Sequence, residues 1–248
     1  MRTKLLDTIF VIPFHFDSED RFQNLQCILK FIQNNFRTNI ILVESYKERP
    51  YARQLVFSGD GMLYIPVKQD GKIFHRTRAI NTGLKEVKTP YAAIYDTDVI
   101  FPIQNIVKAV ELLRDGVQVV YPYAGDFVDI ERSYVDDGAI IERESFTKES
   151  KGGAVFVNKD DYWKAGYENE NLMSHAPEDV ERYVRLYTLG YRIARTEGKC
   201  WHINHARSMN SSPTHPYVAS NMKEYEKVKA MNKEELEAYI KTWGWAKQ

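Results

Sequence analysis

The segment TPYAAIYDTDVIFP, residues 89–102, constrains this chain most, because a short apolar run passes directly into two carboxylates. Residues 91–95 have the length and aromatic composition of a buried strand, and Asp96 and Asp98 follow it. Burying an ionised carboxylate without a partner costs several kcal/mol, so this pair needs a cation, an arginine or a helix terminus. We favour a divalent metal that carries phosphates. The alternative is that both aspartates only cap a turn, since acidic triplets are common by chance.

Apolar runs of strand length alternate with segments of helical periodicity, and this alternation predicts an α/β fold with βαβ units and a parallel sheet. Ligands of such sheets gather at the carboxyl ends of the strands. The residues from Pro13 through His15 to Asp17, and Glu44, are therefore candidates for contacts with a nucleotide base and ribose; for Glu44 the alternative is a solvated loop acid. We expect strands at 8–14, 39–43, 62–67, 91–95, 117–123, 154–157 and 191–196, and helices at 20–35, 80–87, 103–114 and 158–166, from 177, from 217 and after 232.

Arg76 and Arg78 precede one of these helices. Cations at the start of a helix oppose its dipole, so an anion such as a pyrophosphate explains the pair better than helix stability does. An exposed arginine pair is the alternative. Residues 124–150 are polar and lack a sustained period, which indicates a surface excursion or a mobile lid. Gly152 and Gly153 then open a strand, where paired glycines let the backbone approach a ligand or adopt a positive φ.

A second acidic pair, Glu178 and Asp179, lies in the first turn of a predicted helix. The helix dipole favours acids there, so a purely structural role is a strong alternative to a second catalytic centre. Further on, His202 and His205 are three residues apart, which places them on one face of a helix but on opposite faces of a strand. In an extended segment at most one of them would reach a metal ion held by the aspartates, unless the chain turns between them.

Composition excludes some classes of protein. The 34 basic and 34 acidic residues cancel, so no global field attracts nucleic acid or anionic lipid. No apolar run approaches the roughly 20 residues that span a bilayer, and the N-terminus has no signal-peptide pattern. We therefore expect a cytoplasmic protein without a transmembrane segment. Cys27 and Cys200 lie in apolar contexts and have no zinc-ligand spacing, which is typical of buried, reduced thiols.

Six segments in order carry a resemblance to a known family: IPFHFDSEDR, FHRTRAINTGL, YDTDVIFP, KGGAVFVNKDDYWKAGY, APEDVERYVRL and HINHARS. Each is weak alone, but their order and spacing resemble the GT-A glycosyltransferases, most closely the β1,4-galactosyltransferase-like group and the related bacterial chondroitin-polymerase-type domains. The match runs from about residue 8 to residue 208. It implies a GT-A fold, with a mixed, mostly parallel central sheet flanked by helices, over residues 1–210 and a C-terminal helical extension over 211–248.

The resemblance also implies roles for individual residues of the first half of the chain. Pro13 and the loop to Asp17 match the uridine-binding loop, and Arg76 matches an arginine that contacts the nucleotide. Asp98 matches the carboxylate that binds Mn²⁺. Asp96 matches an acid on the ribose side of the site or behind the metal ligands.

In the second half, the Gly152 and Gly153 pair matches glycines beside the donor sugar. Glu178 matches a ligand of an acceptor or donor hydroxyl, and Asp179 matches the general base. His205 matches the metal-binding histidine, and His202 stands where animal members have a methionine ligand; imidazole is the better ligand for Mn²⁺. The family's tryptophan- and glycine-rich segment before the acids is here MSHAP, residues 173–177, so acceptor specificity does not carry over.

The activity that the resemblance implies is an inverting, metal-dependent transfer of a hexose or N-acetylhexosamine, with galactose favoured, from a UDP-sugar to a saccharide hydroxyl. The cofactor is Mn²⁺, with Mg²⁺ as the alternative. The acceptor is a saccharide of polysaccharide biosynthesis or a lipid-linked saccharide, the latter with a peripheral position at the inner membrane face. Two alternatives are a nucleotide-sugar-binding module without catalysis and a sugar nucleotidyltransferase. The second normally needs a Gly-rich, basic loop after the first strand, and HFDSED is neither.

Overall fold

The computed structural model describes residues 2–55, 61–71, 73–132, 142–174, 177–206, 208–212 and 214–247. Among these residues seven strands form a central sheet in the order β10-β6-β9-β4-β1-β2-β3. Only β9 runs antiparallel to its neighbours in this sheet, and the other pairs are parallel. The predicted mixed, mostly parallel α/β sheet is confirmed. Its strands are β1 (Thr3–His15), β2 (Phe36–Tyr46), β3 (Met62–Lys68), β4 (Tyr91–Tyr95), β6 (Val119–Tyr121), β9 (Ala154–Asn158) and β10 (Ile193–Arg195).

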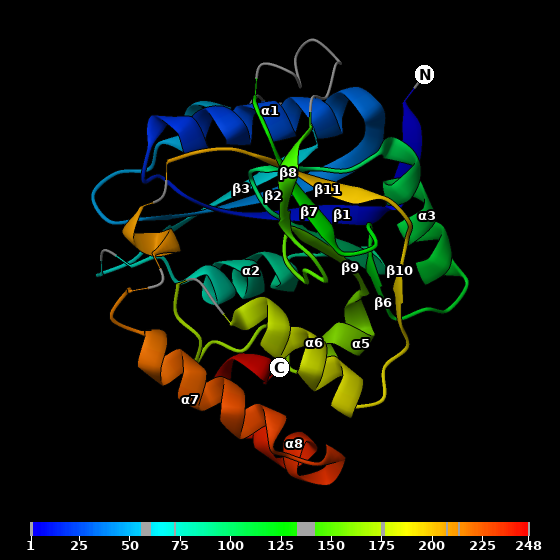
Figure 1. Ribbon diagram of the computed structural model, residues 1–248, viewed down its shortest axis with the longest axis vertical. Coiled ribbons are helices and arrows are strands. Elements are labelled where there is room, and N and C mark those ends of the chain that lie inside the picture. The colour runs from blue at the N-terminus through cyan, green and yellow to red at the C-terminus, as the bar shows by residue number, and fades with distance from the viewer. Residues whose placement is uncertain are drawn as a thin grey trace.

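Helices cover both faces of this sheet, with α1 above it and α2 below it in Figure 1. Helix α1 begins after Ser18, whose side chain accepts a hydrogen bond from the Arg21 backbone N–H. Helix α2 packs closely on the sheet at Gly83, which has no side chain. A Cβ at this position would lie only 2.5 Å from Val11 Cγ1. The helices are α1 (Glu19–Asn35), α2 (Arg76–Lys85), α3 (Ile103–Arg114), α5 (Lys159–Lys164), α6 (Glu178–Thr188), α7 (Val218–Lys229) and α8 (Lys233–Ile240), with 3₁₀ turns at Ala52–Leu55, Met209–Ser211 and Gly244–Ala246.

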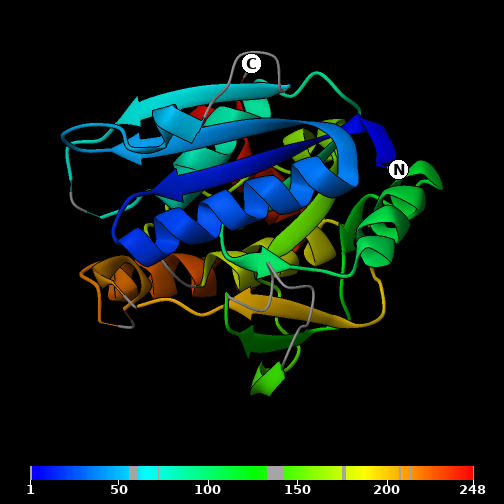
Figure 2. The same cartoon turned by 90° about the horizontal axis from the view of Figure 1, so that it is seen from above.

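A second sheet lies beside the first and was not expected from the sequence. Its order is β5-β11-β7-β8, and Figure 2 shows β7, β8 and β11 next to one another on one side of the central sheet. Residues 124–150, expected from the sequence to be a surface excursion or a mobile lid, contain the strands β7 and β8. Residues 133–141 lie outside the described residues, and the choice between the two interpretations stays open. Short strands with one solvated face leave only a weak alternation in the sequence. The strands are β5 (Val99–Ile100), β7 (Asp126–Ile130), β8 (Glu142–Thr147) and β11 (Lys199–Ile203).

The C-terminal helices α7 and α8 form the lowest layer in Figure 1 and pack against α6. Val228, Leu236 and Trp243 from this segment are buried in the same hydrophobic core as the central sheet. The boundary between 1–210 and 211–248 stays a prediction. None of the described helices is long and apolar enough to cross a bilayer. Both cysteines are buried and free, as expected.

Candidate active site

A cavity of about 550 Å³ opens at the carboxyl ends of β1 and β4. The start of α2, the start of α6, the end of β11 and residues 147–153 complete its lining. This is the place where parallel sheets of this kind bind ligands. The structure brings most of the predicted site residues together in this lining: Pro13, His15, Asp17, Arg76, Asp96, Asp98, Gly152, Gly153, Glu178, Asp179, His202 and His205.

Asp98, His202 and His205 form a candidate metal centre on one wall of the cavity, and their ligand atoms all lie within 4.8 Å of one another. His205 Nε2 is 3.1 Å and His202 Nε2 is 3.9 Å from Asp98 Oδ2. Pairing of β5 with β11 brings the two segments side by side. Strand β11 ends at Ile203, so the chain leaves the extended conformation before His205 and both imidazoles reach the same carboxylate.

Each imidazole is oriented through its other nitrogen. His202 Nδ1 lies 2.7 Å from Asp129 Oδ1, and His205 Nδ1 lies 2.9 Å from the Ala206 carbonyl oxygen. Both rings therefore present Nε2 to Asp98, as metal-binding histidines do when a second partner holds Nδ1. One carboxylate and two imidazoles suit a divalent transition-metal ion. Asp129 was not predicted, because it lies in the stretch that looked irregular.

Electrostatics support an ionised Asp98. Burial raises the pKa of its carboxyl, but the hydrogen bond from His205 and the charges of His202 and Arg21 outweigh burial and hold the pKa well below its usual range. In return, Asp98 raises the pKa of His205 against the effect of burial. Arg21 Nη1 lies 3.5 Å from Asp98 Oδ2 and its Nε lies 3.2 Å from Asp17 Oδ1. Arg21 is a site residue that the sequence analysis missed; it lies in the first turn of α1, four residues after Asp17 of the preceding loop.

A second charged cluster surrounds Arg76 at the start of α2. Its guanidinium is 2.5 Å from Asp96, 3.6 Å from Glu178 and 3.7 Å from Asp179. Burial lowers the pKa of Arg76, but these carboxylates outweigh it and raise the pKa. Burial and the neighbouring Asp179 raise the pKa of Glu178 to about 8. Burial also raises the pKa of Asp96, against the charge of Arg76. The contact of Arg76 with a nucleotide stays a prediction.

Asp179 lies between a glycine and an arginine. Its Oδ1 accepts a hydrogen bond from Arg182 Nη2, and a Cβ added to Gly152 would lie 3.0 Å from its Oδ2. The adjacent Gly153 has φ +81°, a conformation that side chains with a Cβ rarely adopt, and a Cβ there would lie 3.2 Å from Cys200 Sγ. Gly153 therefore has the positive φ that the sequence allowed for, whereas Gly152 lies close to a side chain of the protein. The approach of this pair to a donor sugar stays a prediction.

Two predicted nucleotide contacts do not line this cavity. Glu44 is fully buried, and its carboxylate accepts hydrogen bonds from the Tyr51 and Ala52 backbone N–H groups and from the Tyr64 hydroxyl. This carboxylate holds the 51–52 turn, and the alternative of a solvated loop acid is wrong. Arg78 is exposed on α2, so only Arg76 of that pair faces the cavity.

No family model matches the sequence, and no curated protein matches it. Among solved structures, GalNAc-T7 with UDP, GalNAc and Mn²⁺ matches with a TM-score of 0.60 at 11% identity, covering 94% of this chain and 50% of that chain. The catalytic domain of Drosophila β1,4-galactosyltransferase 7 with xylobiose matches with a TM-score of 0.48 at 16% identity, covering 78% of this chain and 64% of that chain. A mutant of that enzyme with manganese, UDP-Gal and xylobiose matches at 15% identity, with the same TM-score and coverage.

This chain thus spans between half and about two thirds of the length of these structures. The likeness to GalNAc-T7 shows a shared fold, which is the GT-A fold of glycosyltransferases. The fold expected from the six sequence segments is confirmed.

Proposed function

We propose that this chain is an inverting, metal-dependent glycosyltransferase that moves a hexose or N-acetylhexosamine from a UDP-sugar to a saccharide hydroxyl. One observation carries the proposal: a single cavity of a GT-A fold holds both the Asp98, His202 and His205 cluster and the separate acidic pair Glu178 and Asp179. The structure of GalNAc-T7, which shares the fold, contains UDP, GalNAc and Mn²⁺.

Asp98, His202 and His205 are the residues that would hold the metal. When bound there, a divalent ion supplies Lewis-acid stabilisation of the charge that develops on the departing diphosphate. Two imidazole nitrogens favour Mn²⁺ over Mg²⁺, which prefers oxygen ligands in octahedral geometry. Arg76 adds a half-buried positive charge beside the same cavity, and a bound anion would compete with its three carboxylate neighbours for the guanidinium.

The acidic pair supplies the proton chemistry. The acceptor hydroxyl oxygen forms a bond to the anomeric carbon while the bond from that carbon to the diphosphate oxygen breaks, and UDP departs with the electron pair. Asp179 takes the hydroxyl proton, a role that requires a carboxylate oxygen within hydrogen-bond reach of the acceptor. Attack opposite the leaving group inverts the anomeric centre. Glu178, whose pKa is raised to about 8, can donate a hydrogen bond to a sugar oxygen at neutral pH.

The test is a panel of UDP-Gal, UDP-Glc, UDP-GalNAc and UDP-GlcNAc, with and without Mn²⁺, in which released UDP is measured without and with saccharide acceptors. A transferase releases UDP from one donor in a metal-dependent manner, and an acceptor accelerates the release. A binding module would bind a donor and release no UDP. A nucleotidyltransferase would turn over only with pyrophosphate or with UTP and a sugar phosphate. Either of the last two results would overturn the proposal.

A further inference from the structure

Arg182 is buried behind Asp179 and joins two carboxylates. Its Nη2 donates to Asp179 Oδ1, and its Nη1 donates to Glu168 Oε1 at 2.9 Å. Nη2 also lies 3.3 Å from the Lys151 carbonyl oxygen, next to Gly152. Arg182 is 1% exposed and Glu168 is fully buried. One guanidinium therefore sets both the position of Asp179 Oδ1 and its spacing from the glycine pair.

Glu168 is itself held from two directions. The Tyr162 hydroxyl donates to its Oε1 at 2.7 Å. Asn81 on α2 accepts from the Glu168 backbone N–H and donates to its carbonyl oxygen, both at 2.9 Å. Helix α2 also carries Arg76, so the support of Glu168 comes from an element that lines the cavity. Arg182 thus has a fixed partner on the side away from Asp179.

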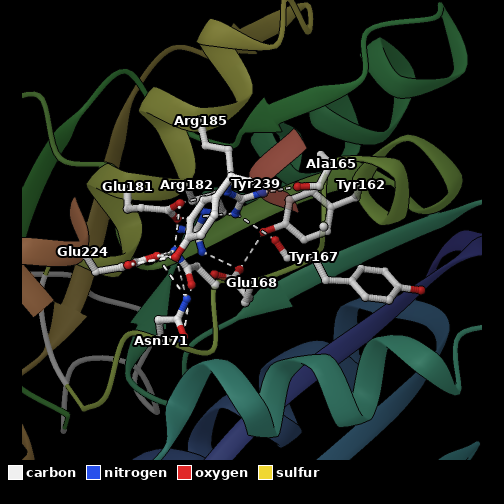
Figure 3. Close-up of polar contacts among 12 residues, drawn as sticks. Tyr162, Ala165, Tyr167, Glu168, Asn171, Glu181, Arg182, Arg185, Glu224 and Tyr239 are labelled. Carbon is white, nitrogen blue, oxygen red and sulfur yellow. Dashed lines mark hydrogen bonds and ion pairs between the residues drawn. The ribbon is translucent and has the colours of Figure 1, made fainter. Parts of the chain in front are cut away.

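Figure 3 shows Arg182 and Glu168 with Tyr162 inside a buried polar network that also includes a second arginine, Arg185. Arg185 is fully buried and donates to Glu181 and to the carbonyl oxygens of Ala165 and Tyr167. The two arginines are on the same helix, and each is bound to a buried glutamate. Of the two, Arg182 is the one that donates a hydrogen bond to Asp179.

We propose that Arg182, held in place by Glu168, is a positioning residue that fixes Asp179 so that Oδ2 faces the acceptor side of the cavity beside Gly152. This inference rests on the proposed function, in which Asp179 takes the acceptor proton. When one oxygen of a carboxylate is bound to a rigid guanidinium, the direction of its second oxygen is fixed as well. A misplacement of a reacting group by about 1 Å can lower the rate about 100-fold.

The charge of Asp179 depends on all the groups that face it. Arg182 lies on its own helix, Arg76 approaches from α2, and Glu178 and Asp96 add negative charge. On the β6 side lie the hydroxyls of Tyr121 and Tyr123. Burial raises the pKa of both hydroxyls, and the negative charge of Asp179 raises it further. Glu168 shares the positive charge of Arg182 with Asp179. Neutralising Glu168 removes one of the two carboxylates that this guanidinium contacts within the described part of the chain, and it favours the ionised form of Asp179.

The experiment compares three full-length variants, Arg182→Lys, Glu168→Gln and the matched control Arg185→Lys, using the donor and acceptor that the wild type turns over. Lysine keeps the charge but lacks the planar, rigid fork of N–H groups with which Arg182 donates to both carboxylates. We expect Arg182→Lys to lower kcat by about 10- to 100-fold with the KM of the donor within about twofold. Glu168→Gln moves the acidic limb of the kcat/KM profile to lower pH. Arg185→Lys lowers the melting temperature and leaves kcat within about threefold, with the pH profile unchanged.

The outcomes separate the two proposals. If the wild type transfers sugar and folded Arg182→Lys has the kcat of Arg185→Lys, the positioning role is wrong and the proposed function stands. An unshifted acidic limb in Glu168→Gln also overturns the positioning role, and this measurement decides alone if Arg182→Lys does not fold. If the wild type turns over no donor, both proposals fail.

Discussion

His205 Nε2 lies 3.1 Å from Asp98 Oδ2, although the two residues belong to opposite halves of the chain. With His202 they offer one oxygen and two nitrogen ligands. We expect Asp98→Ala to abolish the metal-dependent part of UDP binding, because the buried carboxylate is the only anion among these three ligands. Isothermal titration of UDP with and without Mn²⁺ measures this. The control is Asp115→Ala, which removes an exposed aspartate. Unchanged Mn²⁺-dependent affinity in Asp98→Ala would exclude the metal centre.

Asp129 is expected to act on the metal through His202, whose Nδ1 it contacts at 2.7 Å. Partners of this kind fix the orientation and basicity of a metal-binding imidazole, and their loss typically weakens metal binding about 10- to 100-fold. We predict that Asp129→Ala raises the dissociation constant of Mn²⁺ by about tenfold. Titration followed by the EPR signal of free Mn²⁺ measures it without any turnover. Asp126→Ala on the same strand should leave the constant unchanged, and an equal effect of both variants would contradict the prediction.

Asp179→Asn tests the base directly. The amide keeps the shape of the side chain but does not accept a proton, so kcat should fall by about 100- to 10,000-fold. Binding of the UDP-sugar should stay within about threefold of the wild type, because the predicted metal ligands are untouched. Steady-state kinetics and a donor titration together give both values. Full transferase activity in this variant would remove Asp179 from the mechanism.

Gly152→Ala tests the close approach of the glycine to the base. The added Cβ would lie 3.0 Å from Asp179 Oδ2, a distance that requires the carboxylate or the loop to shift. A shift of a few tenths of an ångström at a reacting group should lower kcat by about tenfold, with little change in melting temperature. The control is Gly244→Ala, where the new Cβ would meet no atom of the described residues within 4 Å, apart from its own chain neighbours. Equal kcat values in the two variants would show that this contact is not used.

Glu178 makes stability depend on pH. Its pKa is about 8 in the folded chain against an ordinary value of 4.5, mainly because of burial and secondly because of Asp179, with Arg76 and Arg182 opposing both. Between these values the folded state binds more protons than the unfolded state, so this group's contribution to the free energy of unfolding decreases as pH rises.

Glu178→Gln should therefore flatten the decline in stability between about pH 5 and about pH 8, a change that urea unfolding at several pH values measures. Glu234→Gln, which alters an exposed glutamate on α8, serves as the control. A decline as steep as that of the wild type in Glu178→Gln would show that Glu178 is ionised in the folded chain throughout this range.

Local sequence determined the elements of the central sheet and several members of the site. The apolar run before Asp96 predicts β4, and the spacing of Leu25, Ile28 and Ile32 predicts the buried face of α1. These signals are local, because hydrophobic period and turn chemistry act over a few residues. The paired glycines were also visible in the local sequence, because the positive φ at Gly153 requires a backbone freedom that other residue types lack.

Tertiary structure decided which charges meet. The sequence could not predict that Arg182 joins Asp179 to Glu168, that Asp129 holds His202, or that Glu44 is bound by a neighbouring turn rather than facing the cavity. It also gave no sign of the second sheet, where pairing of β11 with β5 carries His202 toward Asp98. Contacts between distant segments depend on strand register and helix packing. The cost of burying a charge requires that each such group has a partner, but it does not specify which one.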